Sequence, residues 1–179
     1  MHKFVALIIF LGLFSLPLTA QSRLEVFGGY QYLHIGGSDG VSGQGFNGWD
    51  AAVTGYFNKF VGVTGDFSGA YKTLDGVSAH VYSYSGGPVV AFREGKVNPF
   101  AHFLVGGETT GASADGVTVS TNGFTMMFGG GVDVKVAHDI SYRVADVDWV
   151  YYHFGGVDGG PSSSQSNDVR ITTGIVLRF

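Results

Sequence analysis

Residues 167–179 read N-D-V-R-I-T-T-G-I-V-L-R-F, and this stretch decides the fold of the chain. Every second residue from Phe179 back to Val169 is apolar, with Thr173 as the exception. The alternate register is charged, at Asp168, Arg170 and Arg178. Because successive side chains of a strand point to opposite faces, the segment is expected to be a strand with an apolar environment on one side and a polar one on the other.

Residues 1–20 have the pattern of an export signal. Lys3 gives a positive start, residues 4–16 are apolar apart from Gly12 and Ser15, and Ala20 is a small residue suited to cleavage. The apolar run is too short to span a bilayer comfortably as a helix. We therefore expect a signal peptide over 1–20 and one domain over 21–179, with a retained helical anchor as the alternative.

The composition supports an exported protein rich in strands and turns. The chain has 30 glycines, 4 prolines, 15% aromatic residues and only 13% charged residues. It has no cysteine, which excludes disulfides, thiolate metal sites and a cysteine-linked lipid. The formal charge is −4 without basic clusters, so nucleic acid is not expected as a partner.

Alternation and turn residues predict eight strands, over residues 23–34, 46–57, 60–70, 77–92, 97–107, 124–136, 140–152 and 167–179. Bulges are expected at Gly86-Gly87-Pro88 and near Ala145-Asp146. Connections after the even-numbered strands are short, whereas those after the odd-numbered strands are mostly longer, including a long soft loop over 108–123. This alternation is typical of an antiparallel up-and-down transmembrane β-barrel. Closure is required because unpaired strand edges are not tolerated in hydrocarbon.

Four short motifs, F-G-G-Y-Q-Y at 27–32, G-G-P at 86–88, P-F-A-H-F-L-V-G-G at 99–107 and F-G-G-G-V-D at 128–133, together resemble the OmpA-like eight-stranded outer-membrane barrel family. The resemblance covers the whole mature chain and implies a bacterial outer membrane location, with lipid as the neighbour. It also implies recognition by the barrel-assembly machinery through Ile175, Leu177 and Phe179. The sequence stops at Phe179, without the peptidoglycan-binding domain of the best-known relatives, so cell-wall anchoring is not expected.

The polar register predicts a charged barrel interior. Its members are Glu25, Asp50, Asp66, Asp133, Arg143, Asp148 and Arg170, together with Lys135 and His102. Buried charges must be paired, so Arg143 and Arg170 are expected to bridge several carboxylates, whereas Lys135 and Glu25 are expected near a solvated mouth. A satisfied polar plug is the main interpretation, because an eight-stranded barrel is narrow. A gate whose ion pairs exchange partners is the alternative.

No catalytic, metal or cofactor site is expected. His153 is followed by Phe154-Gly155-Gly156, and the hydroxyls of 162–166 have no fixed base or orienting acid. His80, His102 and His138 are scattered singly, without the close spacing of metal ligands.

The aromatic residues favour a membrane barrel, because most of them fall on the apolar register toward strand ends, as in interfacial girdles. They are Tyr30, Tyr32, Trp49, Phe57, Phe67, Tyr142, Trp149, Tyr151 and Phe179. The sequence thus predicts a monomeric integral barrel with a structural or surface-interaction role, displaying four long mobile loops whose ligand it does not identify. A narrow low-conductance pore with a charged lumen is one alternative. A soluble periplasmic β-sandwich or lipocalin-like carrier is another.

Overall fold

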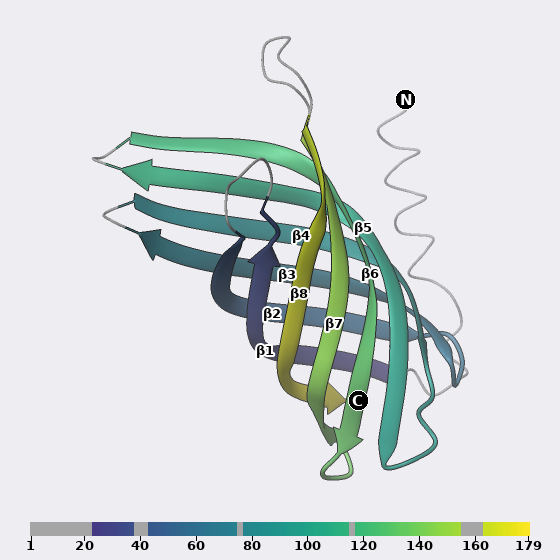
Figure 1. The fold of residues 1–179 in the computed structure, drawn as a ribbon. Coiled ribbons are helices and arrows are strands. Elements are labelled where there is room, and N and C mark those ends of the chain that lie inside the picture. The colour runs from purple at the N-terminus through teal and green to yellow at the C-terminus, as the bar shows by residue number, and fades with distance from the viewer. Residues whose placement is uncertain (1–22, 38–42, 75–76, 115–116, 155–162) are drawn as a thin grey trace, which may run out of the picture.

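The computed structural model describes residues 23–37, 43–74, 77–114, 117–154 and 163–179. Their strands are β1 (Arg23–Ile35), β2 (Gln44–Tyr56), β3 (Val61–Leu74), β4 (Val77–Ala91), β5 (Val97–Ala114), β6 (Val117–Lys135), β7 (Ile140–Phe154) and β8 (Ser163–Arg178). Each strand is antiparallel to the next, and β1 also pairs with β8 (Figure 1). The predicted all-β, eight-stranded, closed up-and-down barrel is therefore confirmed. The expected signal peptide lies outside the described residues.

The two ends of the barrel differ, as the sequence predicted. One end, here called the turn end, carries the short connections over 57–60, 92–96 and 136–139, together with Arg23 and Phe179. In the first of these turns the Asn58 carboxamide oxygen accepts bonds from the backbone N–H groups of Phe60 and Val61, both at 2.8 Å. The opposite end is here called the loop end.

Within the described residues, no helix is long and apolar enough to cross a membrane.

The predicted long soft loop over 108–123 is wrong. Strands β5 and β6, with 18 and 19 residues, continue through it and pair as far as Ala114 opposite Val117. Its threonine, serine and valine residues suit strands, and cross-strand pairing satisfies their backbone groups despite the intervening glycines. Strand β3 likewise runs on to Leu74, into the loop expected over 71–76. Two of the four long loops expected at this end are therefore tips of long hairpins, which extend to the left in Figure 1.

The two predicted bulges have different outcomes. Strand β4 keeps one register against β3 through Gly86, Gly87 and Pro88, so no bulge is present there. Its pairing with β5 skips only Gly87 and Pro88, because proline has no N–H to donate. In β7 the register shifts between Arg143 and Asp146 against β8, within one residue of the predicted position.

The barrel has an apolar outer face and a polar inner face. The exposed outer side chains include Val53, Phe67, Phe128, Trp149 and Ile175, and the predicted girdle aromatics lie on this same face. Outer aromatic side chains also contact one another. The indole N–H of Trp49 donates to the hydroxyl of Tyr71 at 3.2 Å. Such a surface suits lipid far better than water.

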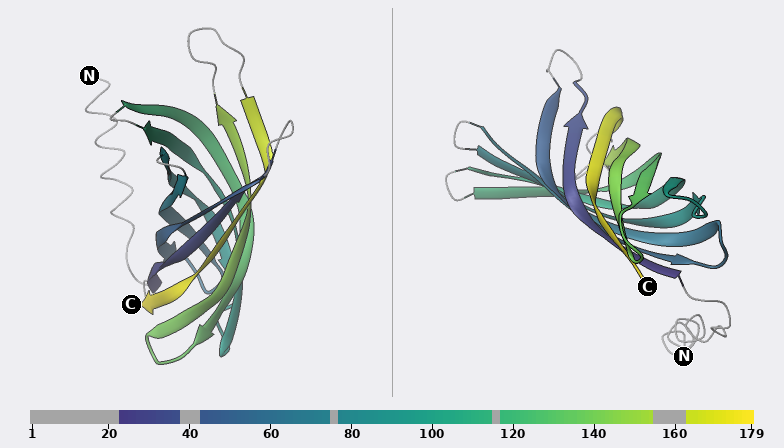
Figure 2. Two further views of the ribbon diagram at one scale, coloured as in Figure 1. Left: turned by 60° about the vertical axis from the view of Figure 1, so that its left-hand side comes forward. Right: turned by 90° about the horizontal axis from the view of Figure 1, so that it is seen from below.

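The barrel wall is strongly curved, as the views in Figure 2 show. Inward-facing glycines allow adjacent strands to approach closely. A Cβ on Gly29 of β1 would lie 2.1 Å from the backbone oxygen of Thr173 in β8. Any side chain at this position would push the β1–β8 seam apart. The glycine content of the chain thus serves closure of a narrow barrel.

Candidate functional site in the barrel lumen

Arg170 of β8 is the centre of the buried charge network. Its Nη1 donates to Asp66 of β3 at 2.8 Å, and its Nε donates to Asp148 of β7 at 2.8 Å. Asp50 of β2 lies 3.9 Å away, and the other Asp148 oxygen contacts His102 Nε2 of β5 at 2.6 Å. Arg170 is only 2% exposed. One guanidinium therefore ties opposite walls of the barrel together.

Arg143 of β7 forms a second centre nearer the turn end. Its Nε donates to Asp133 at 2.9 Å and its Nη1 donates to Asp146 at 3.3 Å. The guanidinium also lies over the rings of Phe27 and Phe100, at 4.4 and 4.1 Å from their centroids. The two rings and the two carboxylates contact the guanidinium from different sides, and this fixes its position in the lumen.

Glu25 of β1 closes the network at the turn end. Its Oε1 lies 2.6 Å from Arg93 and 2.9 Å from Arg178, and the Arg93 guanidinium covers the Tyr56 ring. The sequence had placed Glu25 at a mouth where water solvates it. That expectation is wrong, because the two arginines seal this end and bury the carboxylate.

The other predicted lumen residues are largely brought together. Lys135 is exposed at the turn end, which confirms its expected place near a solvated mouth. The sequence reasoning missed Asp146, and it did not include Arg93 or Arg178 in the network. Arg178 shares the polar register of Arg170, and this signal was available in the sequence. Arg93 comes from a turn, where alternation gives no information.

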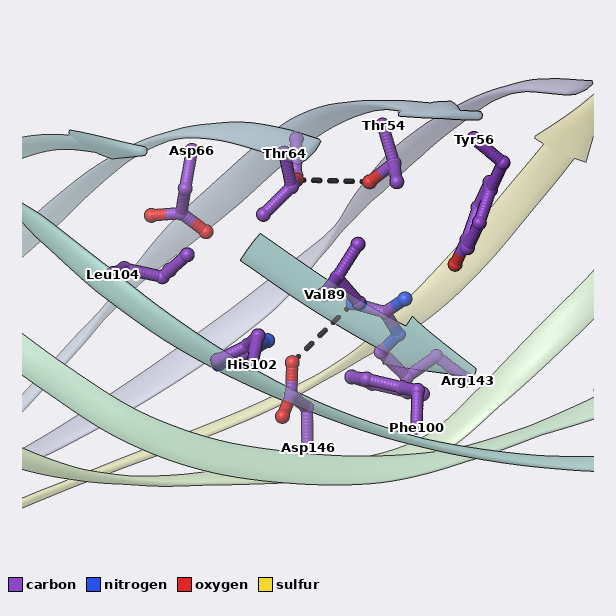
Figure 3. A pocket seen from close by; sticks show the side chains of 11 residues that line it. Thr54, Tyr56, Thr64, Asp66, Val89, Phe100, His102, Leu104, Arg143 and Asp146 are labelled. Carbon is purple, nitrogen blue, oxygen red and sulfur yellow. Dashed lines mark hydrogen bonds and ion pairs between the residues drawn. The ribbon is translucent and has the colours of Figure 1, made fainter. Parts of the chain in front are cut away.

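The exact position of the bulge in β7 explains why Asp146 was missed. The sequence placed the bulge at Ala145-Asp146 itself, whereas the register shifts between Arg143 and Asp146, so that Asp146 already belongs to the second half of the strand. Without the bulge, Arg143 and Asp146 would face opposite sides of the sheet, because they are an odd number of residues apart. The extra residue turns Asp146 inward, so that its side chain lines the cavity (Figure 3). Asp146 and Asp148 are both buried. Gly129 and Gly131 of β6 lie opposite Asp148 and Asp146. A Cβ on Gly129 would lie only 2.0 Å from an Asp148 oxygen, so the glycine makes room for the carboxylate.

Two apolar clusters pack the lumen between Arg170 and the loop end. One cluster contains Leu33, Phe46, Ala70 and Val81, and another contains Leu104, Met127, Val150 and Tyr152. The acids Glu108 and Asp168 are also buried in this part of the barrel. Side chains thus fill the interior along its length, as expected for a barrel of this size.

A polar cavity remains beside the two arginine centres. Its lining includes Thr54, Thr64, Asp66, His102 and Asp146 (Figure 3). The other histidines of the described residues lie elsewhere. His138 contacts the neighbouring Asp139 in an exposed turn, and His80 packs against Tyr82 on the outer surface.

Four strands project beyond the rest of the wall at the loop end. The β2–β3 pairing ends at Tyr71 and the β6–β7 pairing ends at Gly123, whereas β3, β4, β5 and β6 remain paired with one another. A strand needs about 9–11 residues to cross the apolar slab, so β5 and β6 extend well past it. Over residues 117–122, β6 pairs with β5 alone among the described strands.

No family model and no curated protein sequence match this chain. Among solved structures, the barrel is similar to Ail, the attachment invasion locus protein of Yersinia pestis, with 18% identity and a TM-score of 0.60 over 89% of this chain and 100% of that chain. It is similar to Neisserial surface protein A, with 11% identity and a TM-score of 0.65 over 89% and 98% of the two chains. The N-terminal β-barrel domain of Pseudomonas aeruginosa OprF gives 10% identity and a TM-score of 0.54 over 89% and 100%. The chain has the eight-stranded outer-membrane barrel fold.

Proposed function

We propose that the protein is an integral barrel of the bacterial outer membrane, with a plugged lumen and a role in surface interaction. The observation that carries this proposal is the two-sidedness of the wall. Large apolar side chains such as Phe128 cover the outside, while ion pairs around Arg170 join opposite walls inside. A soluble carrier would place its apolar face toward a ligand rather than toward solvent. The barrel is proposed to be a monomer without catalytic activity.

The turn end is assigned to the periplasm and the loop end to the outside, following the usual pattern of outer-membrane barrels. The charges then divide unequally between the two ends. Residues 33–46, 70–80, 106–124 and 151–168 contain a single lysine, Lys72, whose amine bonds to Gln44. By sequence, the same segments contain six acids, namely Asp39, Asp75, Glu108, Asp115, Asp158 and Asp168. Glu108 and Asp168 are buried, and the other four lie outside the described residues. The proposal that this end favours cationic partners therefore rests on the excess of acids over lysines in the sequence of these segments.

The projecting sheet supplies the surface for such a partner. Residues 117–122 of β6 read V-T-V-S-T-N. The valines and threonines of this stretch have high strand propensity, and it contains no charged residue and no proline. Charged residues and proline are what native edge strands use to prevent pairing with another chain. We infer that this edge accepts an extended, basic polypeptide by strand addition, in which main-chain bonds give affinity and the acidic surroundings give selectivity.

A structure of Ail, at 16% identity, contains the heparin analogue sucrose octasulfate as a ligand of a barrel of this fold. Sulfated ligands require cationic side chains. The single lysine of the loop-end segments makes such a polyanion a poor match for the present chain. The excess of acids over lysines in the sequence of these segments instead supports the opposite choice of ligand charge.

Membrane location and lumen state are tested together. The full chain is expected to fractionate with outer membranes and to leave them only in detergent. Recovery in the soluble fraction would contradict the proposal. The refolded barrel is expected to give a silent planar bilayer, because layered side chains fill the lumen. Steady single-channel steps would support the narrow-pore alternative instead.

Strand addition is tested with two ten-residue peptides, (Lys-Thr)5 and (Glu-Thr)5, titrated into the refolded protein. The lysine peptide is expected to bind and the glutamate peptide to fail. Ser120→Lys adds a charge to the β6 edge and is expected to weaken binding. Thr109→Lys adds the same charge to β5, an interior strand of the same sheet, and serves as the control. Equal losses in the two variants would show that charge alone, and not the edge, governs binding.

A further inference from the structure

We propose that the lumen binds one divalent transition-metal ion between His102 of β5 and Asp146 and Asp148 of β7. Each residue offers one ligand atom, and these atoms all lie within 4.8 Å of one another. All three side chains are buried. Ions of this class bind imidazole nitrogen and carboxylate oxygen at about 2.0–2.2 Å, so a small inward adjustment of the three side chains is enough to surround one ion.

The wall on both sides of the cluster is shaped to hold it. The β7 bulge turns Asp146 into the same space as Asp148, as bulges do where a side chain must be re-aimed. Gly129 and Gly131 leave the opposite strand without side chains at these two levels. The cluster therefore depends on three local departures from regular, side-chain-filled strand structure.

An unused ligand atom points to the ion independently of this clustering. Asp146 is only 2% exposed, and its Oδ2 accepts the bond from Arg143. Its Oδ1 is buried without a hydrogen-bond partner, although it belongs to a residue that lines the lumen cavity together with His102 (Figure 3). Leaving a buried carboxylate oxygen unsatisfied is costly. A cation in the cavity would satisfy it.

The charges around the cavity also favour a cation. The guanidinium groups at the level of the cavity are those of Arg143 and Arg170. Arg178 pairs with Glu25 and comes no closer to Asp133 than 3.9 Å. They face more carboxylates than they can neutralise, namely Asp50, Asp66, Asp133, Asp146 and Asp148. Asp50 also has a buried oxygen, Oδ1, without a partner. A divalent ion would compensate the excess negative charge where desolvation makes it most costly.

The ion and the arginines use different atoms. Arg170 binds Asp148 through Oδ2, whereas His102 contacts Asp148 through Oδ1 at 2.6 Å. This short contact is a shared hydrogen bond. On binding, the metal takes its place, so that the proton leaves to solvent and His102 Nε2 and Asp148 Oδ1 each donate an electron pair to the ion. The Asp148–Arg170 and Asp146–Arg143 pairs remain as the surrounding support.

The ligand set selects the class of ion. One imidazole and two carboxylates suit Zn²⁺, Co²⁺ or Mn²⁺, whereas Ca²⁺ and Mg²⁺ prefer oxygen ligands alone. Water from the cavity would complete the coordination shell. Because the site is enclosed, we expect the ion to enter during folding or through slow opening of the barrel.

The test uses the full-length protein refolded in detergent with Co²⁺, which reports nitrogen and oxygen ligands through its visible absorption. Wild type is expected to retain about one ion per barrel after desalting and to show a ligand-field band. Asp146→Asn keeps an acceptor for Arg143 but removes a charged ligand, and His102→Gln removes the nitrogen. Each is expected to weaken retention by at least about tenfold.

Asp133→Asn is the matched control, because it removes a lumen carboxylate that binds Arg143 but lies outside the cluster. It is expected to retain Co²⁺ as wild type does. Equal losses in Asp133→Asn and Asp146→Asn would overturn the proposal and assign the effect to lumen charge in general. Failure of wild type to retain Co²⁺, or equal retention of Mg²⁺, would also overturn it. Heat-modifiable migration on gels verifies that each variant has closed its barrel.

Discussion

Replacement of Arg170 is the sharpest perturbation of the lumen. Arg170→Met preserves length and apolar volume but removes the cation that contacts Asp50, Asp66 and Asp148. These carboxylates lie inside the barrel and are only 3%, 4% and 0% exposed. Protonation or entering water can relieve part of the resulting penalty, but neither restores the bonds that Arg170 makes to two opposite walls.

The expected loss follows from those contacts. Breaking a buried ion pair by removal of one partner costs about 3–5 kcal/mol, because the remaining charge stays buried. Several charge-assisted bonds are lost here, so we expect a value near the upper end of that range. With a urea m-value of about 2 kcal/mol/M, a loss of about 4 kcal/mol lowers the unfolding midpoint by about 2 M.

The assay is urea unfolding of the refolded barrel in lipid vesicles, followed by tryptophan fluorescence and by heat-modifiable migration. Lys59→Met is the control, because Lys59 pairs with Glu94 at 3.3 Å in an exposed turn and is expected to change stability by no more than about 1 kcal/mol. If Arg170→Met falls within 1 kcal/mol of wild type, the carboxylates are hydrated, and the description of the lumen as an ion-paired plug is refuted.

Three further changes examine the wall, the lipid face and assembly. Gly129→Ala is expected to destabilise the barrel by about 1–3 kcal/mol in the same urea assay, because its methyl group would collide with Asp148. Gly28→Ala, where a Cβ meets nothing within 4 Å, should have little effect, and equal costs would show that both sites reflect strand propensity alone. Nitroxide spin labels on the outer face are expected to show oxygen accessibility typical of lipid, and accessibility to a water-soluble relaxant would contradict membrane burial of this face. The labelled positions are Val53, Phe128 and Ile175. Phe179→Ala is expected to reduce the amount of folded barrel in cells while leaving refolding in detergent unchanged, as gel migration would show, whereas a refolding defect would indicate a packing role for Phe179.

The alternation of side chains was enough to predict which residues face the lumen in regular strands. Asp50, Asp66 and Arg170 follow this pattern, because period-two geometry holds wherever neighbouring strands stay in register. The same reasoning failed at Asp146, because it placed the β7 bulge at this residue, whereas the register shifts between Arg143 and Asp146. It also failed for the segment over 108–123, where glycines suggested a loop but pairing between β5 and β6 extended both strands.

From its residues alone, the chain determined the strand count, the closed topology and the apolar outer face, because each depends on local alternation and turn chemistry. Only the tertiary structure decided which charges meet. Asp66 and Arg170 lie far apart in the sequence but 2.8 Å apart across the lumen, and His102 reaches Asp148 from a different strand. Pairing across a closed barrel depends on register, stagger and bulges together, and these quantities are set by the whole sheet and not by any one strand.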